Sequence, residues 1–509
     1  MAENQIIEYI PIEDIGSRKH PQYDEKYELW DFLLSSYRGG LGMQNRTGMP
    51  ASHELTIKPQ GYYAGLFKWR KENQDDYINR VSITPYRPYA RRIVKAFVNY
   101  VTKDDPARKG FESYAEYINN IDLKGTDIKS FVRSILALQK VIGEYNILVD
   151  MPALIIQPIS KYEMVQNGTR PYCIPVSPQN IVDWNINDKG LYDWLIIENT
   201  WYESLLSDKR GKTHKRRTFW NESVWQVYEQ TSEIKSGKKQ SWGLINSGEH
   251  PCGRVPVIRV SGEDLDYNPE TPESWFYDLA DINRAIYNLE SIDIENFHTQ
   301  CFGQLIMPGK TVQSKEQARI VSSAEAMTET PEESGISRFI QPSGIEHETI
   351  ETKIMNLRME MYRLAGLFHR TDSRVAESAE AKAWDHEEMF QFLTAFSQTA
   401  EYIETQIFNL INRWTGKQEF NGSVEYPKNY AVEDIERLMT SILDLKQIGF
   451  ASELGRKETL KRVYKEILGS HVSPETMQTI EKEIDNSTEE NPLANFTLNN
   501  NSQSEGVTV

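Results

Sequence analysis

Hydrophobic residues recur at helical spacing in three segments of the first 142 residues. The spacing predicts helices over residues 26–37, 86–103 and 127–141. Gly39 and Gly40 should end the first helix, and Asp127 is placed to cap the third. The apolar positions are Tyr27, Trp30, Leu33, Leu34, Tyr37, Ile93, Val94, Phe97, Val98, Val101, Phe131, Ile135, Leu138 and Val141.

The periodicity then changes to short apolar or alternating runs bounded by Gly, Pro, Asn and Asp. These runs predict strands over residues 145–150, 172–176, 194–201 and 224–228. A basic stretch over residues 209–217 is expected to form a solvated hairpin tip. Residues 1 to about 265 are therefore expected to form an α+β region, with helices first and then a mainly antiparallel sheet.

The second half of the chain is predominantly helical in pattern. Apolar steps of three and four predict helices over residues 273–300, 348–368 and 377–414, the last with a near-heptad repeat. Residues 301–347 are expected to form a small mixed insert between the first two of these helices. A polar break over residues 369–374 separates the second from the third.

The C-terminal part is expected to form a small helical unit. Helical patterns cover residues 432–449, 452–468 and 474–484. The tail after residue 486 is rich in Asn, Ser and Glu and is expected to be disordered.

Composition and charge exclude several classes of protein. The 509 residues are 39 % hydrophobic, contain no apolar run of membrane-spanning length and begin without a signal-peptide pattern, so we expect no membrane association. The net charge of -17 argues against a protein that grips nucleic acid, because non-specific affinity comes from Lys and Arg on phosphates. Cys173, Cys252 and Cys301 lie far apart and are interpreted as ordinary buried thiols.

Catalytic motifs are incomplete wherever they begin. Gly211-Lys212-Thr213 and Gly309-Lys310-Thr311 lack the glycine four residues earlier that a phosphate-binding loop needs. His386-Glu387 opens like a zinc-protease helix, but Phe390 stands where the second histidine would be. We therefore expect no catalytic residue, no cofactor and no dedicated metal site.

One enzymatic alternative stays open on the acidic helix. Asp278 and Asp281 share a face of it, as do Glu290 and Asp293. Carboxylates of this kind hold divalent cations in metal-dependent nucleases. A metal-dependent enzyme acting on nucleic acid is therefore one hypothesis for this helix. The alternative is that its acidic face is simply solvated.

The order of the parts resembles the portal proteins of tailed double-stranded-DNA bacteriophages, over residues 21–484. Two segments, residues 143–150 and 170–184, are similar to passages of the family's wing. A third segment, residues 275–305, looks like its first stem helix entering the clip. A fourth, residues 377–383, occupies the place where the family's long tunnel helix begins. The fold class implied is α+β and mainly helical. The implied parts are a wing (1–272), first stem helix (273–300), clip (301–347), second stem helix (348–368), tunnel loop (369–376), long tunnel helix returning to the wing (377–430), C-terminal helical crown (431–485) and disordered tail (486–509).

The resemblance implies a homo-oligomeric ring, typically of twelve subunits, at one capsid vertex of a virion assembled in the host cytoplasm. Double-stranded DNA would pass through its channel during packaging and ejection, and its partners would be the terminase large subunit, a head–tail adaptor and the major capsid or scaffolding protein. A shorter virion ring protein, such as an adaptor, is a weaker possibility.

Three sets of residues are expected to carry that function. The tunnel loop facing the DNA is His369, Arg370, Thr371, Asp372, Ser373 and Arg374. The acidic stem lining the channel is Asp278, Asp281, Glu290 and Asp293, because an electronegative wall disfavours lasting contact with phosphates. A basic hairpin that contacts phosphates would comprise Lys209, Arg210, Lys212, Lys215, Arg216 and Arg217, although the family pattern does not account for it.

Overall fold

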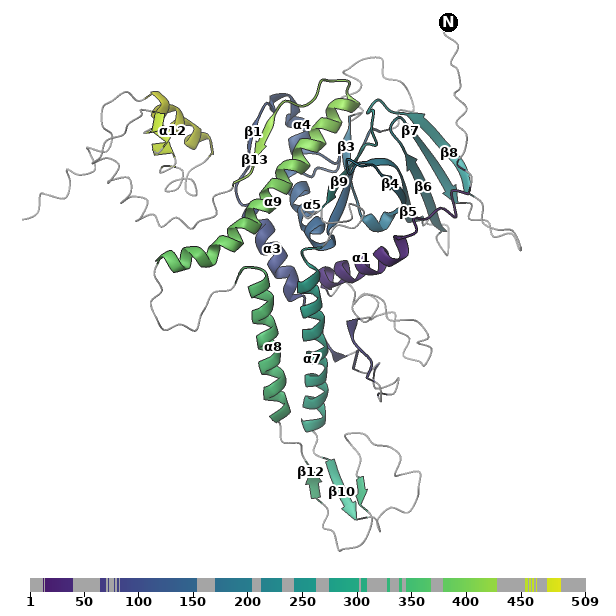
Figure 1. The fold of residues 1–509 in the computed structure, drawn as a ribbon, viewed down its shortest axis with the longest axis vertical. Coiled ribbons are helices and arrows are strands. Elements are labelled where there is room, and N and C mark those ends of the chain that lie inside the picture. The colour runs from purple at the N-terminus through teal and green to yellow at the C-terminus, as the bar shows by residue number, and fades with distance from the viewer. Residues whose placement is uncertain are drawn as a thin grey trace, which may run out of the picture. The chain divides into compact units, whose positions relative to one another are not determined.

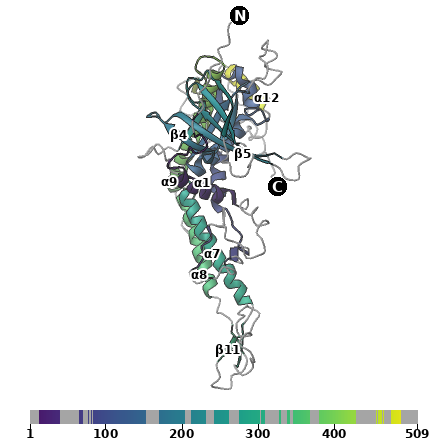
Figure 2. The same ribbon diagram turned by 90° about the vertical axis from the view of Figure 1, so that its right-hand side faces the viewer.

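The computed structural model (Figures 1 and 2) divides into two units, Met1–Asn429 and Tyr430–Val509. The residues that it describes are 12, 14–39, 65–69, 72, 77, 80–81, 83–152, 170–203, 212–230, 242–261, 274–301, 304–308, 327–329, 338–340, 345–367, 379–427, 454–455, 457–458, 460–461, 464 and 474–486. Each unit is considered by itself below.

The three helices predicted near the start are present. They are α1 (Tyr23–Arg38), α3 (Tyr89–Val101) and α5 (Ile128–Ile142), with the shorter η3 (Glu112–Tyr114) and α4 (Ala115–Asn119) between the last two. Asp127 caps α5 as predicted, since its side chain accepts a hydrogen bond from the Ser130 backbone N–H at 2.8 Å. Gly39 follows α1 with φ of +63°, a conformation that favours glycine.

A three-stranded antiparallel sheet lies next along the chain. Its order is β3 (Tyr172–Val176), β2 (Glu144–Asp150) and β9 (Val257–Ser261), with β2 in the centre. Gly143, with φ of +93°, turns the chain from α5 directly into β2. Because β2 pairs on both sides, six of its seven residues are buried, Asp150 at its end being half-buried.

A five-stranded antiparallel meander forms the second sheet, visible at the upper right of Figure 1. After η4 (Pro178–Asn180), its strands follow chain order: β4 (Ile181–Ile186), β5 (Tyr192–Glu203), β6 (Lys212–Trp220), β7 (Val224–Gln230) and β8 (Trp242–Glu249). The prediction of a solvated hairpin tip over residues 209–217 is wrong from Lys212 onward. Those residues lie in β6, which pairs with β5 along its whole length and with β7 from Arg216 onward.

Two helices with a small sheet between them come next. These are α7 (Tyr277–Cys301) and α8 (Ile345–Leu364), which lie side by side in Figures 1 and 2. Between them, β10 (Gln304–Pro308) pairs in parallel with β11 (Met327–Glu329) and in antiparallel with β12 (Arg338–Ile340). The two predicted helices are confirmed, and the residues described between them form strands.

The longest helix, α9 (Ala379–Trp414), supplies much of the core of the first unit. The near-heptad repeat predicted over residues 377–414 is confirmed as a buried stripe from Leu393 to Leu410, in which Phe396, Ala400, Ile403 and Ile407 are at most 1 % exposed. The stripe packs against α3, α5, β2 and β9. Trp414 donates its indole N–H to the Val149 carbonyl at 2.8 Å, which fastens the end of the helix to β2.

The chain then pairs with an early segment. β13 (Ser423–Glu425) forms a two-stranded antiparallel sheet with β1 (Ala107–Lys109). Beneath it, the fully buried carboxylate of Glu404 accepts two hydrogen bonds from Arg108, at 2.7 and 2.8 Å, and one from the Tyr426 hydroxyl at 2.6 Å. A buried carboxylate needs such partners, because leaving it unpaired would cost several kcal/mol.

In the second unit, the structure contains α12 (Pro474–Asn486), which covers the predicted helix over residues 474–484. The helix predicted over 432–449 and the tail after 486 lie outside the described residues. Of the helix predicted over 452–468, only seven separate residues are described.

Candidate functional site

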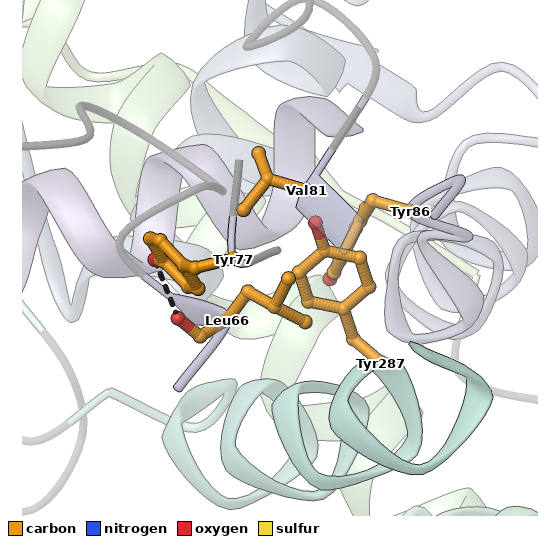
Figure 3. Packing of buried hydrophobic residues seen from close by; sticks show 5 residues of the cluster. All are labelled: Leu66, Tyr77, Val81, Tyr86 and Tyr287. Carbon is orange, nitrogen blue, oxygen red and sulfur yellow. Dashed lines mark hydrogen bonds between the residues drawn. The ribbon is translucent and has the colours of Figure 1, made fainter. Parts of the chain in front are cut away.

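Helix α7 is held against an early segment of the chain by apolar and polar contacts. Figure 3 shows the apolar part, in which Tyr287 of α7 packs edge-on against Tyr86 with ring centroids 5.2 Å apart. Tyr77 donates its hydroxyl hydrogen to the Leu66 carbonyl at 2.9 Å within the same cluster. The buried Arg80 adds a hydrogen bond of 2.7 Å to Ser291 Oγ on α7. One face of α7 is therefore buried against other segments of this chain.

Glu290 lies on that buried face, and its side chain is buried as well. Its Oε1 accepts hydrogen bonds from Arg87 Nη1 at 2.9 Å, from the Tyr89 hydroxyl at 3.1 Å and from Arg358 Nη2 at 3.2 Å. The carboxylate raises the pKa of Arg87 through its charge, and burial together with that charge raises the pKa of Tyr89. Glu290 thus joins α3, α7 and α8, and the expectation that it lines an open acidic face is wrong.

The other three predicted acids lie nearer to solvent. Asp278 is exposed, and Asp281 is half exposed and paired with Arg284 one turn later. Asp293 accepts a hydrogen bond of 2.5 Å from His347 Nδ1 at the start of α8. That hydrogen bond, with the charge of Asp293, raises the pKa of His347 above its ordinary value.

These carboxylates do not converge on a common point. Glu290, Asp293 and Asp281 each turn to a different basic partner. Among the described residues, no group of three or more His, Cys, Asp or Glu side chains is arranged to hold a metal ion. No observation on α7 therefore favours the metal-dependent enzyme.

Helix α8 carries apolar side chains that the described residues of this chain leave exposed. Met355 is 62 % exposed and Tyr362 is 42 % exposed, and Met359 lies between them at helical spacing. Phe297, near the end of α7, is 61 % exposed. Large exposed apolar side chains gathered on one helix are typical of a surface that meets a partner.

The basic stretch is neutralised by acids from neighbouring strands. Arg217 is buried and donates from Nε to Glu198 at 2.8 Å, while its Nη1 bonds to the carbonyls of Ile15 and Arg18. Arg216 and His214 both reach Glu229, and Lys215 lies 3.7 Å from Glu198. The predicted phosphate-contacting hairpin is therefore wrong for Arg217, which fastens the N-terminal segment. The positions of Lys209 and Arg210 and the side chain of Lys212 lie outside the described residues.

The six predicted tunnel-loop residues, 369–374, also lie outside the described residues. Cys173 and Cys252 are buried free thiols, as expected. Burial raises the pKa of Cys252 to about 12, so it is a poor nucleophile. In the part of the chain that the structure describes, no helix is both long and apolar enough to cross a membrane.

A cleft between the two sheets is a feature that sequence reasoning missed. It has a volume of about 720 Å³ and is lined by β2 and β3 on one side, by β5 to β8 on the other, and by Trp414. Its polar groups include Asp150, Tyr172, Ser177 and Arg216. The sequence feature that could have pointed to this cleft is Asp150, a carboxylate at the end of a buried apolar strand.

Comparison with known proteins gives limited similarity. A family model described as a domain of unknown function, DUF4055, matches residues 275–415, which run from the residues before α7 to the end of α9. No curated protein matches the chain.

Two solved structures from gene transfer agent particles are similar to the chain. One is from the virion of a native particle, at 12 % identity and TM-score 0.36 over 75 % of this chain and 90 % of that one. The other is from the neck of an empty particle computed with C6 symmetry, at 12 % identity and TM-score 0.36 over 76 % of this chain and 91 % of that one. A TM-score of this size does not establish a common fold, so the conclusions below rest on the arrangement of this chain's own elements.

Proposed function

We propose that this protein is the portal subunit of a tailed double-stranded-DNA phage or phage-like particle. The observation that carries the proposal is the helical hairpin of α7 and α8. It bears a small sheet at its turn and stands between an α+β body and the 36-residue helix α9, which packs back on that body. In this proposal the body is the wing, α7 and α8 are the stem, and the β10–β12 sheet is the clip.

The apolar side chains of α8 that the described residues leave exposed support assembly into a ring, for which we propose twelve subunits. A heterologous contact that repeats around a closed ring buries the same two surfaces in every subunit. Met355, Met359 and Tyr362 supply an apolar surface for such a contact. Burying it would remove the solvation cost that it carries in a single chain.

The remaining acids suit a channel through which DNA moves. Asp278 and Asp281 are exposed or half exposed at the start of α7, and the chain carries 74 acidic against 57 basic residues. An acidic wall gives no lasting phosphate contact, because such contacts depend on Lys and Arg replacing bound counterions. We assign the lining role to Asp278, Asp281 and Asp293, and exclude Glu290 because its carboxylate is buried.

Residues 369–374 are proposed as the loop that touches the passing DNA. Arg370 and Arg374 would give brief contacts with phosphates at one level of the channel. The proposed place of the ring is one capsid vertex of the virion, where it would dock the terminase large subunit and later the head–tail adaptor. The capsid or scaffolding protein would contact its rim. The C-terminal crown and the tail after residue 486 belong to the same proposal.

The mass and shape of the purified protein test this proposal. Light scattering should give about twelve times the 59.0 kDa of one chain, and negative-stain images should show rings with a central channel. Met355→Glu should reduce the mass to that of smaller species, because it places a charge on the contact face. Asn356→Glu, an equal change of charge at the exposed neighbouring position, is the control and should still form rings. A single-chain mass for the unaltered protein would contradict the proposal.

Deleting residues 370–373 tests the loop separately. The ring should form normally while DNA packaging or retention falls, because the loop would act on DNA and not on the neighbouring subunit. If the ring itself were lost, the loop would be a structural element of the assembly and its proposed DNA role would be wrong.

A further inference from the structure

Two parts of the chain pack on opposite sides of α7. On one side, the Arg284 guanidinium lies 5.6 Å from the centre of the Phe67 ring, and Asn288, one turn later, accepts a hydrogen bond from the Phe67 backbone N–H at 2.9 Å. On the other side, Asp293 accepts a hydrogen bond from His347 of α8 at 2.5 Å. Arg284 and Asp293 are separated by about two and a half turns of helix, so they point in opposite directions. The segment around Phe67 and helix α8 therefore do not meet across α7.

The segment around Phe67 exposes large aromatic side chains next to basic groups. Phe67 is 51 % exposed and Trp69 is 45 % exposed. Lys68, between them in the sequence, is exposed as well. The backbone here is fixed, because the buried Arg80 donates from Nη2 to the Phe67 carbonyl at 2.6 Å. Phe67, Lys68 and Trp69 form a basic aromatic patch.

The exposed apolar side chains of α8 lie along one stripe. Met359 and Tyr362 follow the exposed Met355 at helical spacing, and all three lie on one side of the helix. Glu348, two turns before Met355, is an exposed acid on the same side. The adjacent Ile354 is buried and lies about a quarter turn away around the helix. These four exposed or half-exposed residues, Glu348, Met355, Met359 and Tyr362, form the α8 stripe.

The aromatic patch and the α8 stripe complement each other. Methionine side chains are flexible and make favourable contacts with aromatic rings. The acid of the stripe and the lysine of the patch have opposite charges, which favours one register of contact over others. Because the two surfaces lie on opposite sides of α7, a contact between them has to join two copies of the chain. Such a contact uses a different surface on each copy, and it therefore repeats head to tail.

We propose that the α8 stripe of one copy packs on the aromatic patch of the next copy, with Met355 against Phe67. This inference rests on the proposed ring and names the second surface of its repeating contact. Each copy gives its stripe to one neighbour and its patch to the other, so the contact continues until the ring closes.

Crosslinking between introduced cysteines tests the pairing in the full-length protein. The test variant combines Met355→Cys and Phe67→Cys with Cys301→Ser, and the other two native cysteines are buried. A short bis-maleimide should join neighbouring copies, and a denaturing gel should show a ladder of trimers and larger species. In the control, Leu364→Cys replaces Met355→Cys. Leu364 is 40 % exposed but lies about half a turn from Met355 around α8, so this control should give single chains.

Light scattering before crosslinking shows whether the ring itself is present. A ring of full mass that gives only single chains after crosslinking would overturn the pairing and leave the proposed ring intact. Trp69→Cys in place of Phe67→Cys should give the same ladder, and this second variant decides the matter if Phe67→Cys lowers the mass.

Three other results would also overturn the inference. Dimers from Met355→Cys without a second introduced cysteine would mean that two α8 stripes face each other. An equal ladder from the Leu364→Cys control would mean that the linkage does not depend on the stripe. A single-chain mass for the unaltered protein would remove the proposed ring and the pairing with it.

Discussion

Phe396 of α9 provides the sharpest test of how the first unit is packed. Its side chain is 1 % exposed and lies among aromatic rings of other segments, 5.6 Å from both Phe97 and Trp275 between ring centroids. Lys140 of α5 places its ammonium group 4.7 Å from the ring centroid. Replacing Phe396 by alanine removes the ring that joins α3, α5 and α9.

The expected cost follows from the buried area. A buried phenylalanine removes roughly 150–250 Å² from water, which at about 25 cal/mol per Å² is worth about 4–6 kcal/mol. The methyl group of alanine retains part of this, and core Phe→Ala changes cost about 3–5 kcal/mol. We expect about 4 kcal/mol, a large share of the roughly 5–15 kcal/mol that stabilises a folded protein.

Urea unfolding followed by tryptophan fluorescence measures this cost, since Trp275 reports from the same cluster. Phe396→Leu keeps most of the apolar volume and should cost roughly 1–2 kcal/mol. Gln398→Ala changes an exposed position two residues away and should stay within about 0.5 kcal/mol. If Phe396→Ala cost no more than Gln398→Ala, the assigned register of α9 and the packing of its apolar stripe would be wrong.

Three further predictions concern polar contacts. Glu290→Gln should destabilise the α3–α7–α8 junction by about 1–2 kcal/mol; the cost stays this small because Arg87 and Arg358 are partly exposed and recover solvation. Backbone hydrogen exchange over α8 should become faster in this variant. It should stay unchanged in the control Glu351→Gln, which alters an exposed carboxylate of the same helix. The pKa of His347, measured by NMR, should lie above about 6.5 and should fall in Asp293→Asn. The stability that this pair contributes is fully present below the pKa of histidine in the unfolded chain and is lost as the pH rises through the higher pKa of the folded protein. A His347 pKa that Asp293→Asn leaves unchanged would contradict the pairing. Arg217→Lys should speed tryptic cleavage after Arg18 and Lys19, because a lysine cannot bond to Glu198 and to the carbonyls of Ile15 and Arg18 at the same time. Lys215→Gln, at an exposed position of the same strand, is the control. Equal cleavage rates in the two variants would refute the anchoring role of Arg217.

The sequence by itself determined the long helices and four of the strands of the first unit. Helices α1, α3, α5, α7, α8 and α9 and strands β2, β3, β5 and β7 begin and end within a few residues of the predicted limits, apart from the longer β5. This succeeds because hydrophobic periodicity and end signals such as Asp127 and Gly39 act over a few residues. The two helices on either side of the insert were readable for the same reason.

Only the tertiary structure decided what the charged residues do. Glu290 and Asp281 look alike on the printed sequence, yet the first is buried against Arg87 and Arg358 while the second is half exposed. Arg217 was expected in solvent, but it is buried and reaches residues about 200 positions earlier. The cleft likewise exists only because two sheets bring Asp150 and Trp220 to one cavity. The energy of a charge depends on which distant groups replace its water, and local spacing carries no record of that choice.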